Sequence, residues 1–294
     1  MTYRSFKNFI NHNTNNHNEK IFDLISNDIK SKIILIVGNR ASNVGEFLSS
    51  IMCTCDIEHT RYVNADKIPV NKRFLIGQNP IDQEIICNNA ESILKSSKKT
   101  LSNDDLLFSL AISLGSKEYA LIEMCEDYYI KIAHKISPFA LVLCIDNDKR
   151  AEFIIDNAPQ GIKEIISLSQ KDNFDYISNK INDNGARITL ASANKITIAD
   201  ANLLGTSFYH YSYLYHISAL DLNNVSLAHL AIESASVLFS APRPYIYKGL
   251  ENARPIFDFE LYSISPTVLI WKGEDEFVLH HKIKSKIDEI KRST

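Results

Sequence analysis

Residues 33–52 constrain the fold of this chain more than any other stretch. Five apolar, β-favouring residues end at Val37 and are followed by Gly38, by a polar loop, and by a helical pattern of apolar residues that begins at Phe47. This order predicts a strand, a tight turn and a helix. In α/β proteins such a turn directs backbone N–H groups and the positive end of a helix dipole to a place where a phosphate can bind.

The loop itself departs from a working phosphate loop. A loop of the type G-x-x-x-x-G-K-[ST] needs glycines for close backbone approach, a lysine for the β/γ-phosphates and a hydroxyl for magnesium. Here no lysine lies between Lys32 and Lys67, and Arg40 is the only cation of the loop. The stretch is therefore interpreted first as an ordinary βα unit of a parallel sheet. The alternative is a degenerate phosphate loop whose candidate cofactor-binding residues are Gly38, Asn39, Arg40, Ser42 and Asn43.

Composition excludes several classes of function. The 294 residues, 45% of them hydrophobic, are enough for one large or two smaller domains. The net charge of −3 gives no basic face, so neither nucleic acid nor an anionic membrane is an expected partner. No apolar run reaches the roughly 20 residues of a membrane helix. The first residues lack the apolar core of a signal peptide, which predicts a cytoplasmic protein.

Along the rest of the chain, short apolar runs alternate with helical patterns, which indicates an α/β fold. Further strands are expected at 119–124, 139–145, 164–168 and 267–271. Helices are expected at 3–10, 21–29, 101–114, 150–157, 222–239, from about residue 80, and from 278 to the end. Residues 187–219 alternate apolar with polar residues and are rich in tyrosine, which is typical of a small antiparallel sheet.

Acidic residues follow two of the predicted strands. Glu123 lies near the end of the first, and Asp146 and Asp148 follow the second. In an open parallel sheet this edge is where ligands bind, so the three acids are candidate metal ligands. Two interpretations remain open, because acids at strand ends also solvate loops or cap the next helix.

Seven stretches, in their order along the chain, resemble folylpolyglutamate synthase and dihydrofolate synthase of the Mur ligase superfamily. They are MTYRSFKNFI, GNRASNVGEFLSSIM, NKRFLIGQNPI, LIEMCED, CIDNDK, LNNVSLAHLAIESA and GLENARPIFDFELYSISPTVLIWKGEDEF. The resemblance implies a P-loop-like, ATP-binding central domain with a parallel sheet and a small antiparallel sheet, here over residues 1–270. Residues 271–294 would be a remnant linker and a helix, and the family's Rossmann-like C-terminal domain is expected to be absent.

The resemblance also implies roles for single residues. Glu123 corresponds to the family's magnesium-binding glutamate, and Asn64 falls in the segment whose serine helps to hold magnesium. Asp148 corresponds to the aspartate that precedes a metal-binding histidine in the family, and that histidine is Lys149 here. Lys163 corresponds to the lysine that the family carbamylates and is the one catalytic candidate. The metal candidates are therefore Glu123, Asn64 and Asp148.

Other family residues are replaced. Ala41 or Ser42 stands where the phosphate-binding lysine of T-G-T-N-G-K-G-S-T belongs. The family's P-G-R, which supplies an ATP-contacting arginine, is Pro-Ile-Phe at 255–257, and its D-G-A-H-N is Lys-Gly-Glu-Asp-Glu at 272–276. In the family, ATP phosphorylates a substrate carboxylate and the amine of glutamate attacks the acyl phosphate. Positioned cations stabilise the moving charge, so their loss predicts a catalytically inactive relative.

Three functions follow from these residues. The first is a pseudoenzyme that acts as a binding or regulatory protein and has no cofactor. The second is an ATP-dependent folate or amino-acid amide ligase that retains Mg-ATP and needs a partner subunit. The third is a protein that binds a small anionic ligand near Arg40, Lys149 and Glu123. A homodimer or a protein partner is expected on the face left by the missing domain, around residues 245–262.

Overall fold

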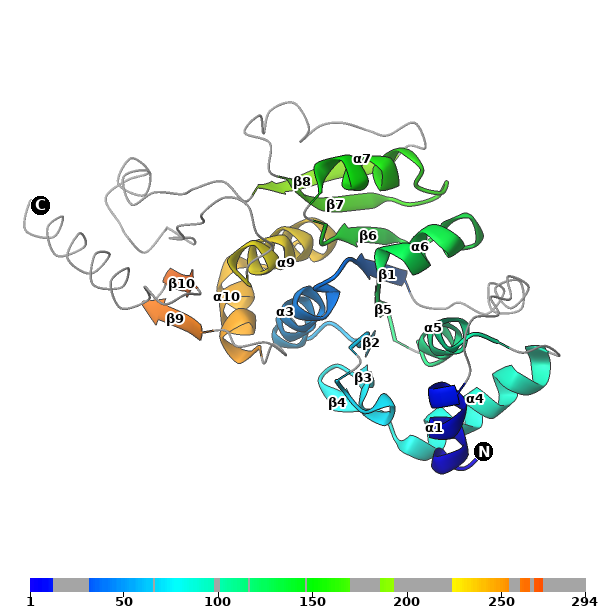
Figure 1. The fold of residues 1–294 in the computed structure, drawn as a ribbon. Helices are drawn as coiled ribbons and strands as arrows, with labels where there is room; N and C mark the ends of the chain where they lie inside the picture. Colours follow the sequence, from blue (N-terminus) through cyan, green and yellow to red (C-terminus); the bar gives the residue numbers. More distant parts are fainter. Residues whose placement is uncertain are drawn as a thin grey trace, which may run out of the picture.

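The computed structural model describes residues 1–12, 32–65, 67–97, 101–115, 117–145, 147–169, 186–192, 224–253, 260–264 and 267–271. Its centre is an eight-stranded sheet in the order β4-β3-β2-β5-β1-β6-β7-β8 (Figure 1). The strands are β1 Lys32–Val37, β2 His59–Tyr62, β3 Phe74–Ile76, β4 Asn79–Pro80, β5 Tyr119–Met124, β6 Ala140–Leu143, β7 Glu164–Ser169 and β8 Arg187–Ser192. From β2 to β8 in this order the strands run parallel, and β3 and β4 add an antiparallel edge.

Helices cover both faces of the sheet. They are α1 Tyr3–His12, α3 Ala41–Thr54, α4 Gln83–Ser97, α5 Asn103–Ser113, α6 Glu126–Ile132, α7 Asp148–Asp156, α9 Asn224–Phe239 and α10 Arg243–Asn252, with 3₁₀ segments at Val70–Lys72 and Ala133–Lys135. Alternate residues of β1 belong to the two cores. Ile34 and Ile36 pack with α3, α9 and α10, whereas Leu35 and Val37 pack with α1 and α4–α7. Both faces of β1 are thus buried, as its unbroken apolar sequence predicts.

β1 lies where the order of the strands reverses. It pairs with β5 on one side and with β6 on the other. The strands β2, β3 and β4, which follow β1 in the sequence, lie on one side of it, and β5 lies between β2 and β1. The later strands β6, β7 and β8 lie on the other side of β1. In open α/β sheets, ligands bind outside the carboxyl ends of the strands at such a reversal. The turn after β1 therefore occupies the position where this fold offers a ligand site.

Helix α10 returns from far along the sequence to pack on α3 (Figure 1). The hydroxyl of Ser50 donates to the backbone oxygen of Gly249 at 2.6 Å, across a separation of 199 residues. A Cβ atom at Gly249 would lie 2.5 Å from the Cα of Ile51. Only glycine permits the two helices to approach this closely, so the sequence at this position fixes the packing of α10.

The predicted α/β fold with a mostly parallel sheet is confirmed, but one predicted element is wrong. Residues 187–192 form β8, which pairs in parallel with β7 rather than in an antiparallel sheet. β8 is the last described strand in the order of the large sheet. A strand at the edge of a sheet can alternate apolar and polar residues whether it pairs in parallel or in antiparallel, so this alternation does not reveal its direction. Arg187 lies opposite Glu164 and bonds its carboxylate through Nε and Nη2 at 2.9 and 2.6 Å. A small antiparallel sheet does exist, formed by β9 Glu260–Ile264 and β10 Thr267–Trp271.

Several other expectations lie outside the described residues. They are the helix at 21–29, the candidate ligand Asp146, the continuation of the proposed sheet over 193–219, and everything after residue 271, including the predicted linker and final helix. The division of the chain at residue 270 therefore stays a prediction. None of the helices in the described ranges combines the length and apolar character that a membrane-spanning segment needs.

Candidate functional site

The turn after β1 is short and closed on itself. β1 ends at Val37 and α3 begins at Ala41. Gly38 has a φ of +135°, and a Cβ atom there would lie 2.3 Å from the backbone oxygen of Cys144, so the position requires glycine. The N–H of Ala41 donates to the Gly38 oxygen at 3.3 Å, and the N–H of Asn43 donates to the Arg40 oxygen at 3.0 Å. Two amides of the turn are thus directed at carbonyls of the chain itself.

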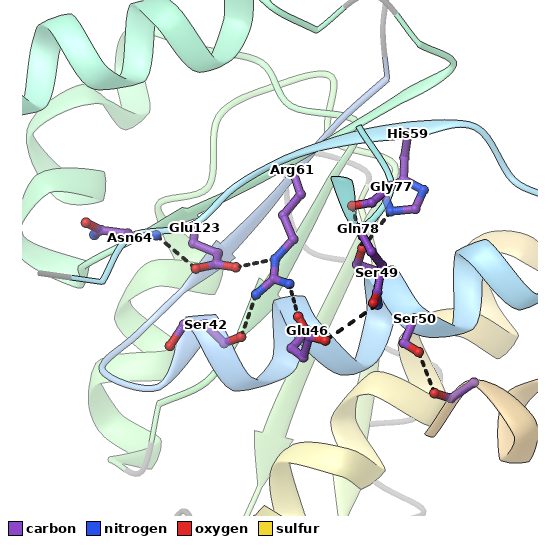
Figure 2. Close-up of polar contacts among 11 residues, drawn as sticks. Ser42, Glu46, Ser49, Ser50, His59, Arg61, Asn64, Gly77, Gln78 and Glu123 are labelled. Atoms are coloured by element: carbon purple, nitrogen blue, oxygen red, sulfur yellow. Dashed lines mark hydrogen bonds and ion pairs between the residues drawn. The ribbon is translucent and has the colours of Figure 1, made fainter. Parts of the chain in front are cut away.

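Helix α3 presents a polar stripe to the strands beside it. Ser42, Gly45, Glu46 and Ser49 have the spacing i, i+3, i+4 and i+7, so they lie on one face of the helix. On the sheet, the alternation of side chains places His59 and Arg61 of β2 and Glu123 of β5 on the side of α3. Figure 2 shows these side chains converging between the helix and the two strands.

Arg61 is the centre of this polar cluster. Its Nε donates to Oε1 of Glu123 at 2.8 Å, its Nη2 donates to the backbone oxygen of Ser42 at 2.9 Å, and its Nη1 forms an ion pair with Glu46. The other carboxylate oxygen of Glu123 accepts the backbone N–H of Asn64 at 2.9 Å. The side chains of Arg61 and Glu123 are 2% and 0% exposed. Both oxygens of Glu123 are therefore bonded by groups of the protein, away from solvent.

Gly45 makes room for this ion pair. A Cβ atom at this position would lie 2.2 Å from Oε1 of Glu123 and 3.2 Å from Nε of Arg61. Any side chain would displace the carboxylate or the guanidinium, because the ion pair lies directly against the helix backbone. The second glycine of the stretch 33–52 thus serves the ion pair rather than a phosphate.

The electrostatics keep the guanidinium charged. Burial raises the pKa of the Glu123 carboxyl, while Arg61 and the N–H of Asn64 act in the opposite direction. Burial also lowers the pKa of Arg61, but the carboxylates of Glu123 and Glu46 outweigh it, so that the pKa of Arg61 is raised. One positive charge is held between two carboxylates. Breaking such a buried pair by removing one partner typically costs about 3–5 kcal/mol.

A second polar pair extends the cluster along α3. Nδ1 of His59 lies 2.9 Å from the backbone oxygen of Ile57, and Nε2 lies 2.7 Å from Oγ of Ser49. Because the carbonyl oxygen only accepts, Nδ1 carries a hydrogen. The Ser49 hydroxyl lies within hydrogen-bond distance of both Nε2 and the backbone oxygen of Gly77, the latter at 3.3 Å. Burial lowers the pKa of His59, and the charge of Arg61 lowers it further, against the hydrogen bond to Ile57. The pair joins α3 to β2 and has no exposed reactive atom, which fits a structural role.

The structure brings some of the predicted site residues together. Glu123 and the backbone of Asn64 meet at the carboxyl edge of the sheet, and Ser42 contributes its carbonyl oxygen to the same cluster. Gly38 lies at the end of β1, where Asn39 is exposed and Arg40 precedes α3 without a side-chain cap bond. These contacts gather around Glu123, and its role as a ligand of a metal stays a prediction.

Other predicted residues do not join this cluster. Lys163 is exposed and directly precedes β7, whose first residue pairs with the first residue of β6. It therefore lies at the amino edge of the parallel sheet, opposite the edge that carries the turn after β1. Asp148 is the first residue of α7. Within the part of the chain that the structure describes, no group of three or more His, Cys, Asp or Glu side chains is placed to hold a metal ion. The predicted metal set of Glu123, Asn64 and Asp148 stays a prediction.

Two central residues, Arg61 and Glu46, are absent from the sequence-based site. Arg61 lies on a four-residue strand whose charged and aromatic character looks like a loop. A signal does exist, since Ser42, Glu46 and Ser49 repeat at helical spacing on one face of a largely buried helix. A polar stripe on a buried helix requires a polar partner, but the sequence does not say which strand supplies it.

Comparison with known proteins identifies the fold. No model of a known family matches the sequence, and no curated protein sequence matches it. Among solved structures, Helicobacter pylori folylpolyglutamate synthetase matches with a TM-score of 0.60 and 16% identity, over 87% of this chain and 67% of that chain. Folylpolyglutamate synthase from Thermotoga maritima matches with a TM-score of 0.60 and 13% identity, over 92% and 70%. A complex of the enzyme with the ATP analogue AMPPCP matches with a TM-score of 0.60 and 14% identity, over 93% and 76%.

Proposed function

We propose that this chain, which has the fold of the folylpolyglutamate synthases, is a catalytically inactive protein that acts by binding or regulation. The observation that carries the proposal is the state of Glu123, the best metal-ligand candidate of the sequence. One of its oxygens accepts Nε of Arg61 and the other accepts the N–H of Asn64. This carboxylate is buried and both of its oxygens are bonded by the protein, so an incoming Mg²⁺ would have to displace the guanidinium of Arg61 to reach it.

The turn after β1 supports the same proposal. Phosphoryl transfer depends on positioned cations and amides around the transferred phosphate, with little other chemistry for the protein to perform. Between Lys32 and Lys67 there is no lysine, and the amides of Ala41 and Asn43 donate to carbonyls of the turn. Losing a single electrostatic contact to the transition state commonly costs about 3–4 kcal/mol. Several such losses together leave no useful rate of ligation.

Thermal unfolding in the presence of Mg-ATP tests the proposal. We expect an unchanged melting temperature at millimolar Mg-ATP, because a ligand that does not bind the native state does not stabilise it. The Thermotoga maritima enzyme serves as a comparison under the same conditions. Binding at 100 times its dissociation constant would add about 2.7 kcal/mol, which is a shift of several degrees. Such a shift with Mg-ATP, and not with Mg²⁺ and sulfate, would contradict the proposal.

The competing function is an ATP-dependent amide ligase that needs a partner subunit. It is favoured by the AMPPCP complex of an enzyme with this fold. It predicts release of ADP when folate and glutamate are added with an extract from the native host, and loss of that release in Glu123→Ala. A third function, the binding of a small anionic ligand, predicts a metabolite that copurifies with the chain in native mass spectrometry.

A further inference from the structure

Three oxygen atoms surround the guanidinium of Arg61. They belong to the carboxylate of Glu46 on α3, the carboxylate of Glu123 on β5, and the backbone carbonyl of Ser42 at the start of α3 (Figure 2). Carboxylate and carbonyl oxygens are the ligands that Mg²⁺ and Ca²⁺ prefer, and neither nitrogen nor sulfur takes part. The bound cation at this place is the side chain of Arg61 itself.

We propose that the Arg61 guanidinium occupies a latent divalent-cation site formed by Glu46, Glu123 and the carbonyl of Ser42. The inference rests on the proposed function, because it gives a reason why Glu123 would not bind Mg²⁺ in the unmodified chain. The two carboxylates carry two negative charges and the guanidinium one positive charge, so a divalent ion would neutralise the pair more completely. A tethered cation needs no metal in solution and fills the site permanently.

The geometry supports replacement rather than a chance ion pair. Glu123 is fully buried on a strand whose neighbouring inward positions are apolar, and a buried carboxylate requires a cation or a proton. Gly45 leaves the space in which the carboxylate and the guanidinium meet, because a Cβ atom there would fall 2.2 Å from Oε1 of Glu123. Mg²⁺ usually keeps several water molecules when it binds to proteins. The flat guanidinium donates to three oxygens, and in the proposed replacement it occupies the position of a partly hydrated ion.

Removing the tethered cation should open the site. We expect the Arg61→Ala chain to bind one Mn²⁺ per molecule, measured without nucleotide by the loss of the free-ion signal in electron paramagnetic resonance. The affinity should exceed that of the unmodified chain at least tenfold. The melting temperature of Arg61→Ala should rise with Mn²⁺ and with Mg²⁺, whereas that of the unmodified chain should not. Arg61→Gln, which keeps hydrogen-bond donors but no charge, repeats the test if Arg61→Ala does not fold without metal.

The matched control is the double variant Arg61→Ala with Glu123→Gln, which keeps the cavity but removes one carboxylate. It should lose the gained Mn²⁺ binding. The inference is overturned if neither Arg61→Ala nor Arg61→Gln gains Mn²⁺ binding, or if the double variant binds Mn²⁺ equally well. Since no nucleotide is present, this result is separate from the proposed function, which fails only if the unmodified chain binds Mg-ATP.

Discussion

Single buried polar residues form the contact between the sheet and α3. Arg61, His59 and Glu123 point from the sheet toward α3, and each finds a partner on the helix or in the backbone. Unpartnered, each would cost folding free energy, since a polar group that loses water without a new bond is penalised. The bonds that stabilise the fold therefore also hold Glu123 in an ion pair.

His59 makes stability depend on pH. Its pKa in the folded protein lies below the ordinary value of about 6.5, chiefly because it is buried. The unfolded chain therefore binds more protons as the pH falls below about 6.5, and the free energy of unfolding should decrease until the folded pKa is passed. Urea unfolding between about pH 5 and pH 7.5 should show that His59→Gln loses part of this decrease.

The matched control for this prediction is His134→Gln, because His134 is exposed. It should keep the pH dependence of the unmodified chain. Equal slopes for His59→Gln and the unmodified chain would show that His59 is not the group that titrates.

Among the elements, α5 shows how a local signal in the sequence fixes a buried helix. Ser102 precedes the helix, and its hydroxyl oxygen accepts the N–H of Asp105 at 3.1 Å. Asp104 and Asp105 lie in the first turn, where negative charge is favourable. The hydroxyl of Tyr128 on α6 donates to Asp105 at 3.0 Å, and burial, together with this carboxylate, raises the pKa of Tyr128. The start of α5 is thus bonded both to its own cap and to a neighbouring helix.

Removing the cap of α5 should have a measurable cost. Ser102→Ala should lower the free energy of unfolding by about 1 kcal/mol, the usual value for a lost N-cap bond. The control on the same helix is Ser113→Ala, which removes only a bond to the Leu110 carbonyl near the C-terminus and should change stability by less than about 0.5 kcal/mol. If both variants unfold at the same urea concentration, the cap does not stabilise the helix.

For the whole molecule, the packing of α10 on α3 joins a late segment of the chain to its first βα unit. Ile246 and Leu250 are buried in the core that contains α3, whereas Tyr245 is half exposed. One face of α10 is therefore covered by the chain itself, whereas Tyr245, Lys248 and Asn252 are exposed. A second copy or a protein partner on the remaining exposed face stays a prediction.

Gly249 should be intolerant of substitution for this reason. Gly249→Ala places a methyl group against the backbone of Ile51, so that α10 must move away. We expect a loss of about 3 kcal/mol in urea unfolding, the upper end for an overpacked contact. On the same helix, Tyr245→Ala should stay within about 0.5 kcal/mol. An unchanged stability of Gly249→Ala would mean that α10 does not pack on α3 in solution.

The sequence alone determined the alternation of strands and helices. Strands β1, β5 and β7 appear as short apolar runs, α5 begins at its capping serine, and Gly38 marks the turn after β1. Each of these signals is local, because propensity, periodicity and capping depend on residues a few positions apart. That is why these elements could be predicted from the sequence, whereas a ligand site at the carboxyl edge of the sheet stays a prediction.

Only the tertiary structure decided which residues meet there. Arg61 lies 62 residues from Glu123 and 15 from Glu46, and their pairing depends on β2 lying beside β5 under the polar face of α3. The direction of β8 and the position of Lys163 at the opposite edge of the sheet depend in the same way on strand order. Strand order is set by the burial of whole faces of the sheet, which no local pattern of residues records.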